Sequence, residues 1–145
     1  MTVMMDTCII LACLPDREPF ADDAEKLILM AAEGEIDGMV TVKSLMDIHY
    51  VLKHVLHDEK KVRESLHVLL DSLIPADSAS EDAVRALSSK MNDYEDALMS
   101  ETAKAYHCEC IITGNTKDYR SSPVPAVTPS VFLKRVSGTA DYPHL

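Results

Sequence analysis

Short apolar segments alternate with amphipathic helical segments along this chain, and this alternation constrains the fold more than any other feature. The apolar segments expected to be strands are residues 3–6, 38–42, 109–113 and 124–128. The segments between them place apolar residues at helical spacing. Strands that alternate with helices through short connections predict an α/β fold, with a mostly parallel central sheet flanked by helices on both faces. We expect a single three-layer domain over residues 1–136 and a C-terminal tail over 137–145.

Helix boundaries can be placed from capping residues and apolar spacing. A first helix is expected just after Asp6, and Ser44 is expected to begin a later helix with Asp47 in its first turn. The pair Ile74–Pro75 is expected to close the helix before it. Asn92 to Glu95 has the side chains of a capping box. The helices expected after the first are 22–34, 44–57, 60–73, 80–91, 92–105 and one that opens at Pro129.

The composition predicts a chain that folds without disulfides or a structural metal. Its 145 residues are 47% hydrophobic, enough for an ordinary aliphatic core. The four cysteines, Cys8, Cys13, Cys108 and Cys110, are expected to be thiols. The longest apolar stretches fall short of the roughly 20 residues that a membrane span needs. Because the N-terminus has no basic signal-peptide region, we expect a cytoplasmic protein.

The charge balance argues against a protein that coats nucleic acid or anionic lipid. The chain has 14 Lys and Arg against 24 Asp and Glu, a net charge of −10. Such a charge opposes broad electrostatic adhesion to phosphate. It is compatible with a nuclease, because carboxylates that gather around divalent cations add to the negative charge of the protein.

Four acids stand where an α/β fold places its chemistry. Asp6 ends the first strand, Asp118 follows the 109–113 strand, and Asp47 and Asp96 lie near helix starts. Ligands of such sheets bind beyond the carboxyl ends of the strands. Carboxylates without a set of Cys or His ligands are typical of sites for Mg²⁺ or Mn²⁺. Each acid alone also has a structural interpretation. Asp47 and Asp96 could stabilise helix dipoles, while Asp6 could be a strand-end residue and Asp118 a turn residue.

Five segments, taken in order, resemble the signatures of PIN domains. These segments are residues 5–11 (MDTCIIL), 41–52 (TVKSLMDIHYVL), 93–98 (DYEDAL), 111–119 (IITGNTKDY) and 127–133 (VTPSVFL). PIN domains are Mg²⁺- or Mn²⁺-dependent ribonucleases, and many small ones are VapC-type toxins neutralised by an antitoxin. The resemblance implies an endoribonuclease of this kind, with a homodimer as the expected assembly. It places the four acids on Asp6, Asp47, Asp96 and Asp118, with Thr113 and Asn115 in support.

Basic residues near these acids are candidates for RNA contacts. Lys43, Lys53, Lys117 and Arg120 could hold phosphates, and they could equally be solvated surface residues. Two departures from the PIN pattern leave a second function open. Cys8 and Ala12 stand where the family usually has Asn and often has Asp. The alternative is therefore a PIN-like domain without hydrolysis that binds RNA or another protein.

Overall fold

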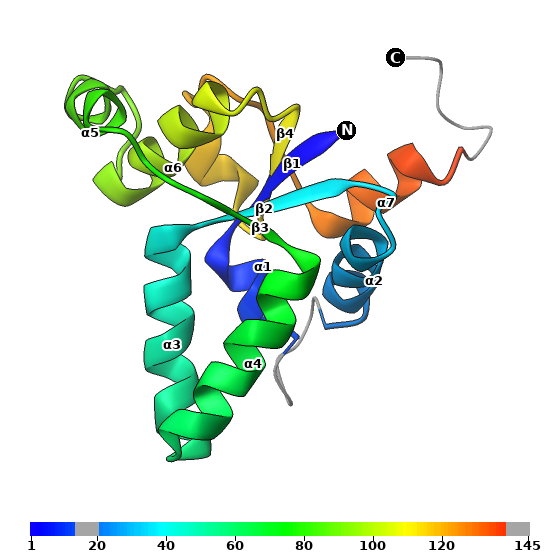
Figure 1. Ribbon diagram of the computed structural model, residues 1–145. Coiled ribbons are helices and arrows are strands. Elements are labelled where there is room, and N and C mark those ends of the chain that lie inside the picture. Colours follow the sequence, from blue (N-terminus) through cyan, green and yellow to red (C-terminus); the bar gives the residue numbers. More distant parts are fainter. Residues whose placement is uncertain (14–20, 139–145) are drawn as a thin grey trace.

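The computed structural model describes residues 1–13 and 21–138, and its centre is a five-stranded parallel sheet. The strands are β1 (Thr2–Met5), β2 (Asp37–Thr41), β3 (Ile74–Ala76), β4 (Cys110–Ile112) and β5 (Ala126–Val127), in the order β3-β2-β1-β4-β5 (Figure 1). Every neighbouring pair is parallel. The predicted α/β class is confirmed, and the sheet is wholly rather than mostly parallel.

The helices connect successive strands and cover both faces of the sheet. They are α1 (Thr7–Leu11), α2 (Ala21–Ala32), α3 (Val42–Leu56), α4 (Glu59–Ser72), α5 (Ser80–Leu87), α6 (Tyr94–Ala105) and α7 (Pro129–Val136), with a short 3₁₀ helix η1 (Thr116–Tyr119) after β4. α3 and α4 form a helical hairpin that projects away from the sheet (Figure 1). α5 and α6 pack together at the other side of the molecule.

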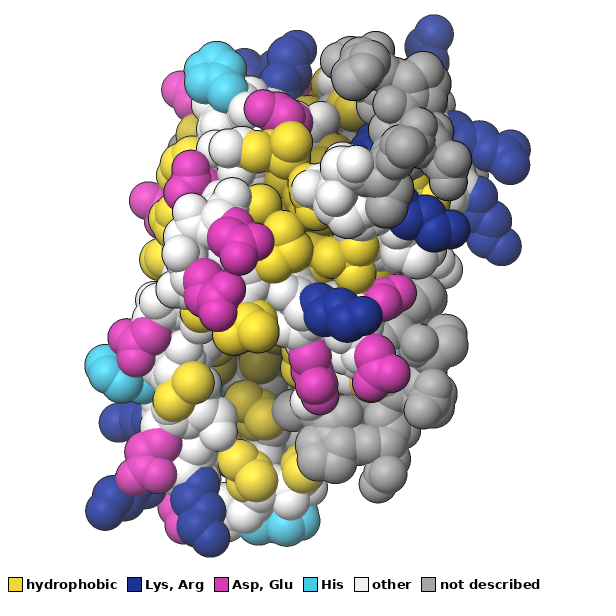
Figure 2. Space-filling view, turned by 90° about the vertical axis from the view of Figure 1, so that its right-hand side faces the viewer, with side chains coloured by type: hydrophobic (Ala, Val, Ile, Leu, Met, Phe, Trp, Pro, Cys, Tyr) yellow, Lys and Arg dark blue, Asp and Glu magenta, His cyan; other side chains and the backbone are white. Residues whose placement is uncertain are grey.

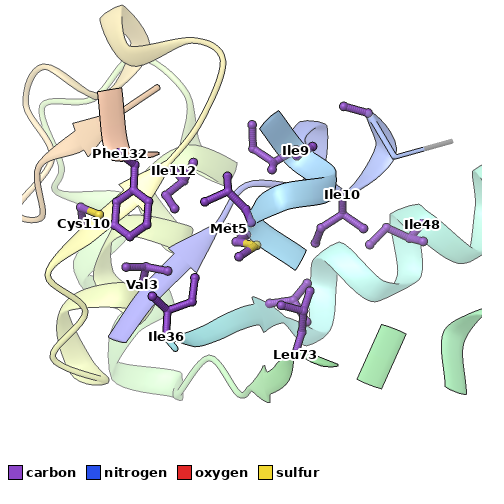
Figure 3. Close-up of a cluster of buried hydrophobic side chains, with 14 of the residues drawn as sticks. Val3, Met5, Ile9, Ile10, Ile36, Ile48, Leu73, Cys110, Ile112 and Phe132 are labelled. Carbon is purple, nitrogen blue, oxygen red and sulfur yellow. The ribbon is translucent and has the colours of Figure 1, made fainter. Parts of the chain in front are cut away.

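Two hydrophobic cores result from the alternation of side chains along the strands. Val3 and Met5 of β1 point to one face and are fully buried with Ile9, Ile112 and Phe132 (Figure 3). The residue between them, Met4, points to the opposite face. There it packs in a second cluster with Met39, Met99, Ala103, Ile111 and Tyr119. Strand β1 is therefore buried on both faces, as expected for a central parallel strand.

The structure corrects several predicted boundaries. Ile74–Pro75 was expected only to close a helix, but these residues open β3. Proline is tolerated there because β3 lies at the edge of the sheet. α5 ends at Leu87 rather than Met91, and β5 is two residues long.

The start of α3 also differs from the prediction. The Thr41 hydroxyl accepts a hydrogen bond from the Ser44 backbone N–H at 3.1 Å, so Thr41 is the N-cap and the helix begins at Val42. Asp47 consequently lies in the second turn of α3, not the first. At α6 the cap is Asp93, whose carboxylate accepts from the Asp96 N–H at 3.0 Å, and not Asn92.

The C-terminal tail is only partly within the structure. α7 ends at Val136, while residues 139–145 of the predicted tail lie outside the described residues. Within residues 1–13 and 21–138, no helix is long and apolar enough to cross a membrane.

Gly38 of β2 provides a test of how closely the layers pack. A Cβ atom at this position would lie 2.9 Å from Leu73 Cδ2, 3.1 Å from Met5 Cε and 3.2 Å from Ala31 Cβ. We expect Gly38→Ala to lower the free energy of unfolding by about 1–3 kcal/mol, because the neighbours must move. Urea unfolding measures this loss. Unchanged stability would mean that the layers at β2 are looser than described.

Candidate functional site

The sheet order reverses at β1, and the polar residues that follow β1 and β4 meet at this point. β2 and β3 extend the sheet on one side of β1, while β4 and β5 extend it on the other. The Asp6 backbone N–H donates to the Ile112 carbonyl at 3.0 Å, which sets Asp6 beside Thr113. Parallel α/β sheets bind their ligands at such a reversal, beyond the carboxyl ends of the strands.

The Asp6 carboxylate is held by hydroxyl groups. The Thr113 hydroxyl, which is fully buried, donates to Asp6 Oδ2 at 2.8 Å. The same hydroxyl accepts from the Asn115 backbone N–H at 3.1 Å, which fixes its direction. Both residues predicted to support the site therefore lie beside Asp6, Asn115 through its backbone. The Cys8 thiol is a further neighbour, with Sγ 3.7 Å from Asp6 Oδ2.

Asp96 faces Asp6 from the first turn of α6. The Tyr119 hydroxyl donates to Asp96 Oδ1 at 3.2 Å and also lies 3.5 Å from Asp6 Oδ2. The pKa of Asp96 is raised to about 6, first by partial burial and then by the negative charges of Asp93, Asp6 and Asp118, against the lowering effect of the Tyr119 hydrogen bond. Because Tyr119 contacts both Asp6 and Asp96 and the charges of Asp6 and Asp118 both act on Asp96, these three predicted residues lie near one another. Asp118 itself is exposed on η1.

Asp47, the fourth predicted acid, has a cationic partner. The Lys43 ammonium lies 2.6 Å from Asp47 Oδ2 and 3.0 Å from Glu95 Oε1, so it links α3 to the start of α6. These contacts raise the pKa of Lys43. All three side chains are at least 37% exposed, so each pair contributes about 0–1 kcal/mol. Lys43 thus pairs with acids at the rim of the site; the sequence left open whether it contacts phosphate or is a solvated surface residue.

The donor chemistry fits a hard divalent cation. In the part of the chain that the structure describes, no three His, Cys, Asp or Glu side chains are arranged to hold one metal ion together. Mg²⁺ does not require such a cage, because it commonly binds one or two carboxylates and completes its shell with water and substrate phosphate. Asp6 and Asp96 provide two carboxylates. A cation there would also relieve the repulsion that raises the pKa of Asp96.

Sequence reasoning missed several residues that shape this site. Tyr119 was not singled out, although it directly follows Asp118 in the motif. A second omission is a set of hydroxyls between α1 and α3. Thr41 Oγ1 donates to Ser44 Oγ at 2.9 Å, and Ser44 Oγ is 2.7 Å from Thr7 Oγ1. Hydroxyl residues next to the predicted acids are the only sequence signal that could have indicated these contacts.

Comparison with known families gives one match. A family model described as "PIN domain" matches residues 2–117, well over half of the chain. This range includes Asp6, Asp47 and Asp96 and ends one residue before Asp118. Among curated proteins, none is significantly similar to the chain.

Solved structures of toxin–antitoxin proteins share the fold. VapBC2 from Rickettsia felis, bound to a DNA fragment from its promoter, matches with a TM-score of 0.67 and 15% identity, over 88% of this chain and 98% of the other. A toxin–antitoxin complex from Klebsiella pneumoniae matches with a TM-score of 0.63 and 23% identity, over 88% and 97%. FitAcB from Neisseria gonorrhoeae has a TM-score of 0.65 and 17% identity, over 88% and 98%. At these identities the likeness concerns the fold.

The charge of Asp96 predicts that Asp96→Asn stabilises the protein more at pH 7.5 than at pH 4.5. Because the pKa of Asp96 rises from 3.8 to about 6 on folding, the folded state binds more protons than the unfolded state between these values. The free energy of unfolding therefore falls as pH rises through this window. Asn carries no charge and removes that loss at pH 7.5. At pH 4.5 the native carboxyl is already protonated.

Thermal unfolding in EDTA at both pH values measures this effect. The matched control is Asp37→Asn, an exposed acid at the opposite end of the strands, which should gain no stability. A destabilised Asp96→Asn variant at pH 7.5 would contradict the described electrostatics.

Proposed function

The chain belongs to the PIN domain family, and we propose that it is a metal-dependent endoribonuclease that hydrolyses RNA phosphodiester bonds as the toxin of a toxin–antitoxin pair. The observation that carries this proposal is the pairing of Asp6 and Asp96 across the reversal of the sheet, with Asp118 close enough to help raise the pKa of Asp96. Mg²⁺ or Mn²⁺ is the proposed cofactor, because the donors are carboxylates.

Each residue of the proposed site has a distinct task. Asp6 and Asp96 hold the cation, and Asp118 adds negative charge to the same edge. Thr113 orients the Asp6 carboxylate through its 2.8 Å hydrogen bond. When bound, the cation stabilises charge on the scissile phosphate and activates water, so no side-chain nucleophile is required. Asp47 is the fourth acid by resemblance, and it would contribute once Lys43 leaves it for the substrate.

Substrate binding is proposed to use basic side chains beside the acids. Lys117 and Arg120 are exposed on and directly after η1, next to Asp118. They are positioned in the chain to hold phosphates that flank the scissile bond. Such contacts supply affinity without reading the base sequence.

The proposed antitoxin partner is supported by the matched structures, one of which, from Klebsiella pneumoniae, is described as a toxin–antitoxin complex. An apolar hollow of about 160 Å³ lies between α1, α2, α3 and α4. Figure 2 shows hydrophobic side chains inside a hollow near the lower end of the face that carries α2. The residues that line this hollow are Ile10, Leu11, Cys13, Ile28, Ile48, Leu52, Ser65 and Leu69.

The proposed place of action is the cytoplasm, where RNA and an antitoxin are available.

A homodimer is proposed on the exposed apolar residues of α3. Val42, Met46 and Tyr50 are spaced by four residues and therefore share one helix face. Their side chains are 45%, 61% and 65% exposed. An apolar stripe of this kind is a natural contact for a second copy of the chain.

We expect the protein to cut single-stranded RNA with Mn²⁺ or Mg²⁺ and not with EDTA. Asp6→Asn and Asp96→Asn should each reduce the cleavage rate at least about 100-fold, because the cation contributes several kcal/mol to the transition state. Asp37→Asn provides the matched control and should cut at the wild-type rate. Gel analysis of a mixed RNA pool measures all three variants.

The same assay separates the alternative function. Wild-type cleavage rates in both site variants would reject the assignment of these acids. An absence of both cleavage and Mn²⁺ binding by calorimetry would favour the inactive RNA- or protein-binding module. Mn²⁺ binding without cleavage would point to a nuclease that requires a different RNA.

Phosphate contacts are tested by the double substitution of Lys117 and Arg120 with Met. In an Asp96→Asn background with EDTA, we expect weaker binding to every single-stranded RNA sequence. The slope of log affinity against log salt should flatten by about 0.7 for each lost contact. Lys60→Met, on the exposed start of α4, is the control. An unchanged salt slope in the double variant would exclude these residues from the RNA path.

A further inference from the structure

Tyr119 lies beneath the acidic site and connects three separate elements there. Its side chain is only 3% exposed. The hydroxyl oxygen is 3.2 Å from Asp96 Oδ1 and 3.5 Å from Asp6 Oδ2. Tyr119 belongs to η1, Asp96 to α6, and Asp6 follows β1. A single buried side chain thus contacts both carboxylates that are proposed to hold the cation.

The hydroxyl of Tyr119 is not needed to fill the core. The ring packs in the second core with Met4, Met99, Ile111 and Val124, and a phenylalanine ring would occupy the same space. Burying a hydroxyl costs free energy unless it forms a hydrogen bond. The hydrogen bonds of this hydroxyl to the two acids therefore account for its presence in the core.

Asp96 depends on this hydroxyl more than Asp6 does. A phenol has one proton to donate, and of the three acceptors near it, Asp96 Oδ1 at 3.2 Å is closer than Asp6 Oδ2 at 3.5 Å or Met99 Sδ at 3.6 Å. Asp6 has an additional donor in Thr113 at 2.8 Å. The backbone of Asp96 is fixed separately, because its N–H donates to Asp93 Oδ2 at 3.0 Å. With its backbone fixed by the cap, the Asp96 carboxylate takes its direction from Tyr119.

We propose that Tyr119 is a positioning residue that aims the Asp96 carboxylate toward Asp6, so that both acids face one cation before it binds. This inference rests on the proposed metal-dependent function and adds a residue to it. The hydroxyl is a neutral donor, so it orients the acids without cancelling their charge. Loss of a hydrogen-bond partner behind a metal ligand typically lowers metal affinity tenfold to a hundredfold.

Tyr119→Phe removes the donor and keeps the ring. We expect this variant to bind Mn²⁺ at least about tenfold more weakly by calorimetry, and its RNA cleavage to recover as Mn²⁺ is raised. The matched control is Tyr106→Phe. The Tyr106 hydroxyl accepts from the Asp77 N–H at 3.1 Å, beyond the other end of α6, so its loss should leave Mn²⁺ affinity within twofold of wild type.

A second measurement tests the hydrogen bond without any cation. In EDTA at pH 7.5, Tyr119→Phe should lower the unfolding midpoint in the wild-type background. It should have a smaller effect in an Asp96→Ala background, where the acceptor is gone. Equal shifts in both backgrounds would mean that the hydroxyl does not act on Asp96, and would overturn the proposal.

The outcomes also separate this inference from the proposed function. Wild-type Mn²⁺ affinity in Tyr119→Phe, or tighter binding, would overturn the positioning role while the metal-dependent function stands. A wild-type protein that binds no Mn²⁺ would overturn the cation site itself, and with it the role of Tyr119.

Discussion

The pairing of β1 with β4 is the contact on which the acidic site depends. Asp6 and Thr113 are 107 residues apart in the chain, yet the backbone hydrogen bond from Asp6 to Ile112 sets them side by side. β4 returns to β1 only after the chain has built β2 and β3 on the other side. The order of the sheet therefore creates a position where two strand ends diverge into different connections. Polar side chains at that position are held by the most buried strands of the fold.

The partners of the acids decide which of them remain available to a cation. Thr113 and Tyr119 are neutral donors, so Asp6 and Asp96 are oriented but keep their negative charge. Asp47 instead pairs with the Lys43 ammonium, which cancels its charge locally. Burial and, after it, repulsion from neighbouring acids raise the pKa of Asp96, and the repulsive part of this cost is what a divalent cation would relieve. The charged acids lower the free energy of unfolding in the absence of a cation, and the same charges would raise the affinity for one.

The sequence predicted the α/β class and the meeting of Asp6 with Asp96 and Asp118, because strand ends and helix starts carry local signals. It missed β3, since Pro75 is a strong helix terminator and its tolerance at a sheet edge depends on neighbours that only the fold supplies. It also missed the contact from Tyr119 to Asp96, which joins residues 23 positions apart on separate elements. No periodicity encodes such a contact. The predicted N-terminal caps of α3 and α6 were close to the observed ones, since Thr41 and Asp93 lie within a few residues of Ser44 and Asn92.

A net charge of −10 opposes the binding of RNA, and the proposed function resolves this through linkage between the cation and the RNA. Phosphate is repelled by Asp6, Asp96 and Asp118 as long as their charges are uncompensated. A divalent cation on these acids reverses the local field, and a phosphate completes its shell of oxygen ligands. In the proposed nuclease, cation and RNA would therefore bind more tightly together than apart, and this coupling would be reciprocal. Affinity for RNA at the cleavage point would thus follow from occupied acids, while Lys117 and Arg120 would hold the flanking phosphates.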